Sequence, residues 1–126
     1  MIRESANDAA TVVAVGVTVY EALKAHDQLK AQGIHIRVVD AYSVQPIDAA
    51  TLVAAGQATR GVIITVEDHY ATGGLGDAVS EAVAPAGLAV RRLAVRELPR
   101  SGQPAELLDR YGISAKHIVD AVRKSA

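Results

Sequence analysis

The chain has 126 residues, of which half are hydrophobic, and its formal net charge at pH 7 is −1. This balance gives no overall field to attract nucleic acid or an anionic membrane. The absence of cysteine excludes disulfides, thiolate metal sites and a cysteine nucleophile. The length suits one domain with its own core. The start lacks the apolar segment of a signal peptide, and no apolar run is long enough to span a bilayer. We therefore expect a soluble, cytoplasmic protein.

The first third of the chain predicts a strand followed by a helix. Residues 1–10 are mostly polar and predict a linker or an edge strand, whereas the β-branched run at 11–17 predicts the first strong strand. Thr18 is placed to cap the next helix, and Glu21, three residues later, completes a capping box. Gly33 is expected to end this helix.

The middle of the chain repeats this alternation. A strand is expected at 34–39, and Asp48 is placed to cap a short helix that fades at a glycine. The continuous apolar run at 62–66 predicts a strand that is buried on both faces. An amphipathic helix follows and ends near Pro85, and residues 88–95 predict another strand.

The last part of the chain is expected to be irregular over residues 96–103. Pro104 suits the first turn of a helix, and Ser114 is placed to cap a final helix. Strands and helices alternate from residue 11 to 103, so the sequence predicts a three-layer α/β domain over residues 11–126.

A candidate site follows from the expected strand order. If the sheet reverses its winding after the second strand, the strands at 11–17 and 62–66 are neighbours, and their carboxyl ends meet at a topological switch point. Ligands and partner surfaces gather at such an edge. The polar side chains predicted there are those of Thr18, Glu67, Asp68 and His69.

Glycines at the start of the following helix suggest an anion site. Free backbone N–H groups near Gly73, Gly74 and Gly76 could hold a phosphate or a carboxylate. The alternative is that these glycines permit a tight turn and close packing of the helix on the sheet. The spacings of the dinucleotide-binding and P-loop motifs are both absent from the sequence.

Other candidate chemistry is incomplete. His69 beside two carboxylates is compatible with acid–base catalysis, but without a nucleophile or a cofactor the alternative is a histidine that bonds its loop or faces another subunit. The sequence offers no set of three or four metal ligands, so we expect no metal. A basic cluster predicts a solvated or subunit-facing rim rather than a nucleic-acid site. Its members are Arg91, Arg92, Arg96 and Arg100.

Several segments resemble the C-terminal domain of the thiamine diphosphate-dependent transketolases. The E-D-H-Y and G-G-L-G elements within 67–76 are shared with related thiamine enzymes, including the β subunits of 2-oxoacid dehydrogenases. The run P-R-S-G-Q-P-A-E-L-L at 99–108 points to transketolase itself. The opening run at 11–23 and Y-G-I-S at 111–114 also match, and the resemblance covers nearly all of residues 11–124.

The resemblance implies a three-layer α/β/α domain with a mostly parallel five-stranded sheet. Its antiparallel edge strand would have to come from residues 1–4. Complete transketolases move a two-carbon ketol unit between sugar phosphates, with thiamine diphosphate and a divalent metal, Mg or Ca. The motif that grips metal and diphosphate and the glutamate that activates thiamine are both missing from this sequence. We therefore expect no catalytic residue, cofactor or metal in this chain.

The leading interpretation is the C-terminal domain or small subunit of a transketolase, inactive alone and serving dimer stability or regulation. Its expected partners are the remaining transketolase domains, in a homodimer of the complete enzyme, without nucleic acid or membrane. The alternative is a non-enzymatic α/β module that binds an anionic ligand or a protein partner. A third interpretation is the matching domain of a dehydrogenase β subunit. The sequence leaves open whether the chain is a natural small subunit or an excised domain.

Overall fold

The computed structural model describes residues 3–15, 17–41, 49–70, 75–95 and 115–125. Within these ranges, four parallel strands form one sheet in the order β2-β1-β3-β4. The strands are β1 (Thr11–Ala14), β2 (Arg37–Asp40), β3 (Ile63–Tyr70) and β4 (Val90–Val95). The helices are α1 (Val17–Lys30), α2 (Ala49–Ala58), α3 (Leu75–Val83), the 3₁₀ helix η1 (Ala84–Ala86) and α5 (Ala115–Ser125).

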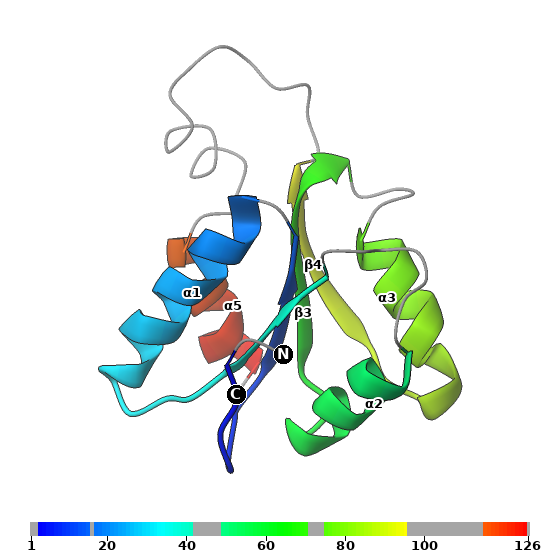
Figure 1. Ribbon diagram of the computed structural model, residues 1–126, viewed down its shortest axis with the longest axis horizontal. Coiled ribbons are helices and arrows are strands. Elements are labelled where there is room, and N and C mark those ends of the chain that lie inside the picture. Colours follow the sequence, from blue (N-terminus) through cyan, green and yellow to red (C-terminus); the bar gives the residue numbers. More distant parts are fainter. Residues whose placement is uncertain (1–2, 16, 42–48, 71–74, 96–114, 126) are drawn as a thin grey trace.

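The sheet lies between two helical layers, as predicted. Helices α1 and α5 lie on one side of the sheet, and α2 and α3 lie on the other (Figure 1). The chain winds from β1 outward to β2 and then, after α2, from β3 outward to β4. Strands β1 and β3 are therefore adjacent at the centre, which confirms the predicted switch point between them.

Each inner strand contributes side chains to both layers. Because successive side chains of a strand point to opposite faces, Val12 and Ile64 pack under α1 and α5, whereas Val13 and Ile63 pack under α2 and α3. All four side chains are buried. Coverage on both faces explains why the sequence shows continuous apolar runs in place of apolar–polar alternation.

The predicted fifth strand, an antiparallel edge strand, is not formed in the described ranges. A single antiparallel bridge joins Arg3 to Val38 of β2, with Arg3 N–H donating to Val38 O at 3.3 Å and Val38 N–H donating to Arg3 O at 3.0 Å. A strand needs several consecutive pairs, and only one described residue of this segment meets β2. In the described ranges, the sheet therefore has four strands in place of the predicted five, with an isolated bridge at its β2 edge.

The predicted capping box at the start of α1 is also wrong. Thr18 bonds back to Val15, and the buried Glu21 Oε1 accepts a hydrogen bond from the backbone N–H of Ala115, at 3.2 Å. Glu21 thus caps α5, a helix that begins 94 residues further along the chain. The predicted cap Ser114 and the predicted helix at Pro104 lie outside the described residues.

Several element boundaries differ from those predicted: β1 ends at Ala14 in place of residue 17, β2 begins at Arg37 in place of residue 34, and β4 begins at Val90 in place of residue 88. Strand β3 extends to Tyr70, past the expected end at residue 66, and α2 continues through Gly56 to Ala58. In the described part of the chain, none of the helices combines the length and hydrophobicity needed to cross a membrane.

Candidate functional site at the carboxyl ends of β1 and β3

Thr18 joins the ends of the two central strands. Its fully buried hydroxyl accepts a hydrogen bond from Val15 N–H at 3.0 Å, and it lies 2.7 Å from both Val15 O and Val66 O. One hydroxyl proton serves one of these carbonyl groups at a time. On the β1 side of the predicted crevice, the Thr18 hydroxyl therefore links the end of β1 to β3 by hydrogen bonds.

Glu67 occupies the start of α3. Strand alternation turns its side chain toward the α2 and α3 layer, where it is 1% exposed. Oε2 accepts a hydrogen bond from Leu75 N–H at 2.6 Å, and Oε1 accepts one from Gly76 N–H at 3.0 Å. A carboxylate at this end of a helix also interacts favourably with the helix dipole. The Glu67 carboxylate thus occupies the anion-binding position at the N-terminus of α3.

This contact bears directly on the predicted anion site. Two of the N–H groups that an external phosphate would need are already bonded to Glu67, so an anion there would have to displace a buried carboxylate. Gly73 and Gly74 lie outside the described residues. The proposed anion or interface role of this turn stays a prediction, and Thr18 and Glu67 are the two members of the set whose side-chain contacts the structure describes.

A bulge follows Glu67. In the pairing of β3 with β4, Glu67 opposes Ala94, but the next pair is Tyr70 with Val95. Asp68 and His69 are therefore left without a partner residue in β4, and β1 pairing has already ended at Val66. Bulges of this kind bend a strand and redirect its residues, and they are frequent beside functional sites. The side chains of Asp68 and His69 lie outside the described part, so their acid–base role stays a prediction.

Arg92 covers the first turn of α3. Its guanidinium bonds Asp77 and donates to Ser80 Oγ at 3.1 Å. A Cβ at Gly76 would lie 2.8 Å from Arg92 Cδ, so a side chain at that position would require Arg92 to shift. This close approach favours the packing role of Gly76. Of the remaining members of the predicted basic cluster, Arg91 is exposed, whereas Arg96 and Arg100 lie outside the described residues.

Two surface hollows formed by described residues lie away from this crevice. One shallow hollow of about 410 Å³ is formed where β3 and β4 begin, and it is lined by residues 61–63 and 89–91. A smaller one of about 140 Å³ lies between residues 7–9 and the end of α2. Among the described side chains, no three His, Cys, Asp or Glu residues gather as a metal site would require.

The roles of two buried glutamates were missed by the sequence analysis. Glu21 caps α5, where it accepts a hydrogen bond from Ala115 N–H. Glu67 caps α3, where it accepts one from Leu75 N–H. The available signal was weak: Glu67 directly follows the predicted buried strand at 62–66 and precedes a glycine-rich helix start. Whether a carboxylate at this position reaches the N–H groups of the next helix depends on how the strand and the helix are arranged in space.

The strand order and the helices on both faces define a doubly wound α/β domain. The family model described as "Transketolase, C-terminal domain" matches residues 1–118. The chain therefore belongs to the transketolase C-terminal domain family.

Curated relatives agree with this assignment. Transketolase-like protein 2 of Mus musculus is 53% identical over 124 residues, which are 98% of this chain and 20% of that protein. Transketolase of Homo sapiens is 47% identical over 124 residues, with 98% and 20% covered. The chain thus spans about a fifth of the length of these relatives.

Solved structures agree on the fold. A "Split gene transketolase, inactive beta4 tetramer" superposes with a TM-score of 0.86 at 38% identity, covering 96% of this chain and 40% of that one. The transketolase of Campylobacter jejuni superposes with a TM-score of 0.63 at 19% identity, covering 97% and 18%, and supports the fold alone. The comparisons do not favour the alternative of an unrelated binding module.

Proposed function

We propose that this chain serves as the C-terminal domain of a cytoplasmic transketolase, which moves a two-carbon ketol unit between sugar phosphates. The family match over residues 1–118 carries this proposal, and the TM-score of 0.86 to a split-gene transketolase supports it. Thiamine diphosphate would supply the carbanion chemistry, with a divalent metal on its diphosphate. Both would be held by the other domains of the enzyme.

Within that enzyme, the role proposed for this chain is non-catalytic and concerns dimer stability or regulation. The contacts at the crevice support this role, because Thr18 ties two strands together and Glu67 caps α3. Both groups are thus engaged in hydrogen bonds within the domain. The proposed partners are the remaining transketolase domains, in a homodimer of the complete enzyme.

The turn from Glu67 to Gly76 is the proposed contact with a neighbouring domain or subunit. The bulge supports this, since Asp68 and His69 leave the pairing of β3 with β4 at the carboxyl edge. The chain can play this part as a domain of a longer protein or as a separate subunit. The similarity to a split-gene transketolase makes the second arrangement a realistic one.

The proposed function is tested by a graft. The corresponding domain of mouse transketolase, which is 48% identical over 124 residues, is replaced by this chain. Ketol transfer from a ketose phosphate to an aldose phosphate is then measured. We expect the graft to retain activity within about tenfold of the parent, a loss of less than roughly 1.4 kcal/mol. The mouse enzyme without this domain and the isolated chain are the controls. A graft no better than the truncated enzyme, or turnover by the isolated chain, would contradict the proposal.

The interface role of the turn has a separate test. His69→Ala is introduced into the graft, and dimer dissociation and ketol-transfer kinetics are compared with those of the exposed-site control His35→Ala. We expect His69→Ala to promote dimer dissociation or alter the kinetics, and His35→Ala to leave both unchanged. If His69→Ala leaves both unchanged as well, the turn does not contribute to the contact.

A further inference from the structure

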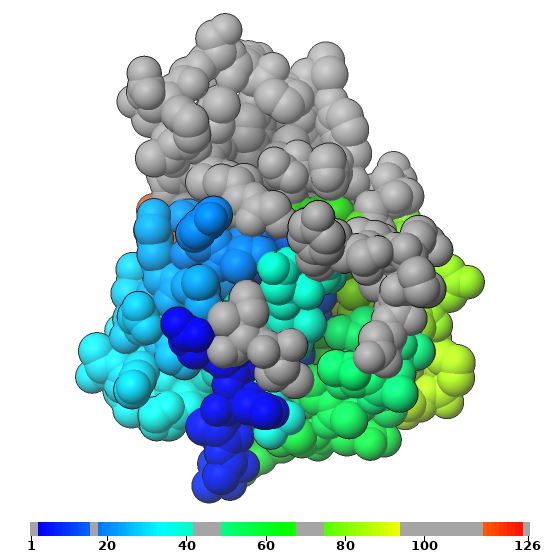
Figure 2. Space-filling view, viewed as in Figure 1, coloured from blue at the N-terminus to red at the C-terminus, as the bar shows by residue number. Residues whose placement is uncertain are grey.

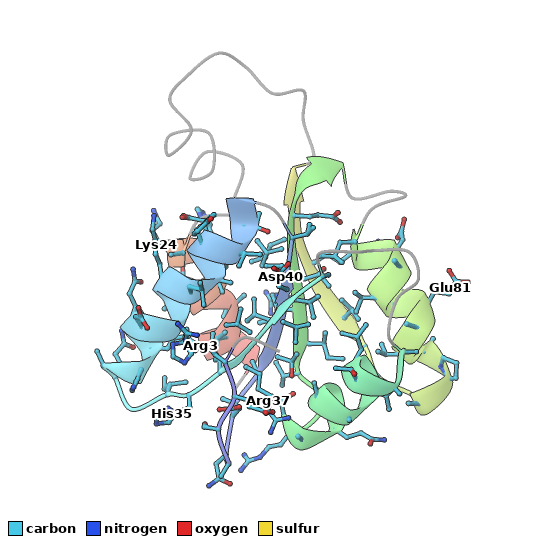
Figure 3. The ribbon with its side chains drawn as sticks, viewed as in Figure 1. Arg3, Lys24, His35, Arg37, Asp40 and Glu81 are labelled. Carbon is cyan, nitrogen blue, oxygen red and sulfur yellow. The ribbon has the colours of Figure 1, made fainter. Side chains whose placement is uncertain are left out.

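The two edges of the sheet differ in the described part of the chain. At the β2 edge, Arg3 exchanges two backbone hydrogen bonds with Val38. This edge faces the viewer in Figure 2, where the N-terminal segment lies beside it in dark blue, and Figure 3 labels Arg3 and Arg37 there. Strand β4 forms the opposite edge and pairs with β3 on its inner side. Within the described ranges, the outward N–H and C=O groups of β4 have no strand partner.

The helical layer of α1 and α5 ends short of the beginning of β4. Parallel partners share a face of the sheet, so Arg91 lies on the same side as Ile64, and Leu93 on the same side as Val66. Ile64 and Val66 are fully buried under the helices, whereas Leu93 is half-buried and Arg91 is exposed. The side chain of Arg91 is therefore accessible beside the unpaired edge.

A shallow hollow of about 410 Å³ lies where β3 and β4 begin. Besides Arg91, its lining consists of uncharged residues: Gly61, Val62, Ile63, Ala89 and Val90. Arg91 forms no hydrogen bond or ion pair with another described residue, and no acidic residue lines the hollow. The second arginine of this strand, Arg92, already bonds Asp77 and Ser80. The hollow thus combines an apolar lining with one available guanidinium.

The unpaired edge, the hollow and the charge together indicate the kind of occupant. Unpaired backbone groups of an edge strand are satisfied by another extended chain, and six residues at about 3.3 Å each offer roughly 20 Å for pairing. A charged side chain on an edge opposes indiscriminate pairing, so Arg91 favours a strand with an acidic residue on the same face. A second copy is disfavoured, because β4 itself carries two arginines and no acidic residue. A small anion would pair with Arg91 and leave the backbone groups unsatisfied.

We propose that β4 binds an extended, acidic segment of a partner protein, which adds to the outer edge of the sheet as a further strand. The main chain of this segment bonds the outward groups of β4, an acidic side chain pairs with Arg91, and an apolar side chain fills the hollow. The backbone bonds supply affinity, and the two side chains supply specificity. This binding involves β4 alone and is independent of the proposed transketolase function.

The test measures amide hydrogen exchange of the chain with and without acetyl-Thr-Val-Glu-Val-Thr-Val-amide, an acidic strand-forming probe. At about 5 mM probe, a dissociation constant of about 2 mM slows exchange roughly threefold. We expect this slowing at every second amide of β4, because the alternate amides already bond β3. The same peptide with Lys in place of Glu should bind at least about fivefold more weakly, the ratio given by roughly 1 kcal/mol of cross-strand charge pairing.

Charge reversal provides the matched variants. Arg91→Glu should invert the preference, so that the Lys probe binds more tightly than the Glu probe by about the same factor. Lys30→Glu makes the same change of charge at an exposed position of α1 and should leave the preference unaltered. If Arg91→Glu does not fold, Arg91→Gln replaces it and should bind the two probes equally.

Three results would overturn the proposal. The first is exchange in β4 that the Glu probe does not slow, or equal binding of the two probes by the parent chain. The second is the same slowing by sodium acetate at equal concentration, which would assign the site to a small anion. The third is a dimer of the chain that protects β4 without any probe, which would assign the edge to a second copy.

Discussion

The Glu67 carboxylate accepts a hydrogen bond from the backbone N–H of Leu75 at 2.6 Å, and both residues are almost fully buried. This bond joins the end of a central strand to the first turn of the next helix. The two bonded residues lie within the segment at 67–76 that the family resemblance includes.

Glu67→Ala should lower the free energy of unfolding by about 2 kcal/mol, because two buried N–H groups lose a charged acceptor. Urea denaturation of the isolated chain measures this loss. Glu81→Ala, an exposed glutamate on the same helix, should change stability by less than about 0.5 kcal/mol. Added formate should restore part of the lost stability by occupying the vacated position. Equal effects of the two substitutions would show that the cap is unimportant.

Glu21→Ala should destabilise the chain by about 1–2 kcal/mol, because α5 loses the acceptor for its first N–H group. Exchange of the first amides of α5 should accelerate most. Lys24 pairs with Glu21 at 3.0 Å, but its side chain is 65% exposed. Lys24→Ala is therefore expected to have little effect, as is usual for exposed ion pairs. Selective loss of α5 protection in Lys24→Ala would contradict this account.

Thr65→Val should raise stability by about 1 kcal/mol, since the Thr65 hydroxyl is buried in the described structure without a hydrogen-bond partner. Thr11→Val is the matched control, because the Thr11 hydroxyl is buried and within hydrogen-bond distance of Ala55 O and Thr59 Oγ1. That substitution should cost about 1–2 kcal/mol. Thermal melts of both variants provide the comparison. A loss of stability in Thr65→Val would indicate that an ordered water satisfies this hydroxyl.

Arg60→Gly should stabilise the chain by about 0.5 kcal/mol. Arg60 has a φ of 60° at the turn between α2 and β3, which costs a non-glycine residue about 1–2 kcal/mol and exceeds the entropic cost of glycine, about 0.5–1 kcal/mol. Gly61, with a φ of 82°, gives the opposite test, and Gly61→Ala should be destabilising. Denaturant midpoints of the two variants should move in opposite directions. A shift in the same direction would mean that the turn can adopt another backbone conformation.

The sequence by itself determined the layers of this domain and its family. The apolar run at 11–17 predicted a strand, and the run at 62–66 predicted a strand buried on both faces. These strands are the adjacent β1 and β3. Periodicity is a local property, so it can be read without knowing the contacts. The motifs at 67–76 and 99–108 pointed to the transketolase family, which the family match then showed.

Only the tertiary structure decided which groups bond one another. Glu21 was expected to cap α1 from within its own turn, but it caps α5, because packing places the inner side of α1 beside Ala115. Glu67 was expected to border an anion site, and in the structure it is itself the anion at Leu75. A polar side chain can choose among several donors of similar strength. That choice is set by which donors the fold buries within reach, and no local sequence pattern contains this information.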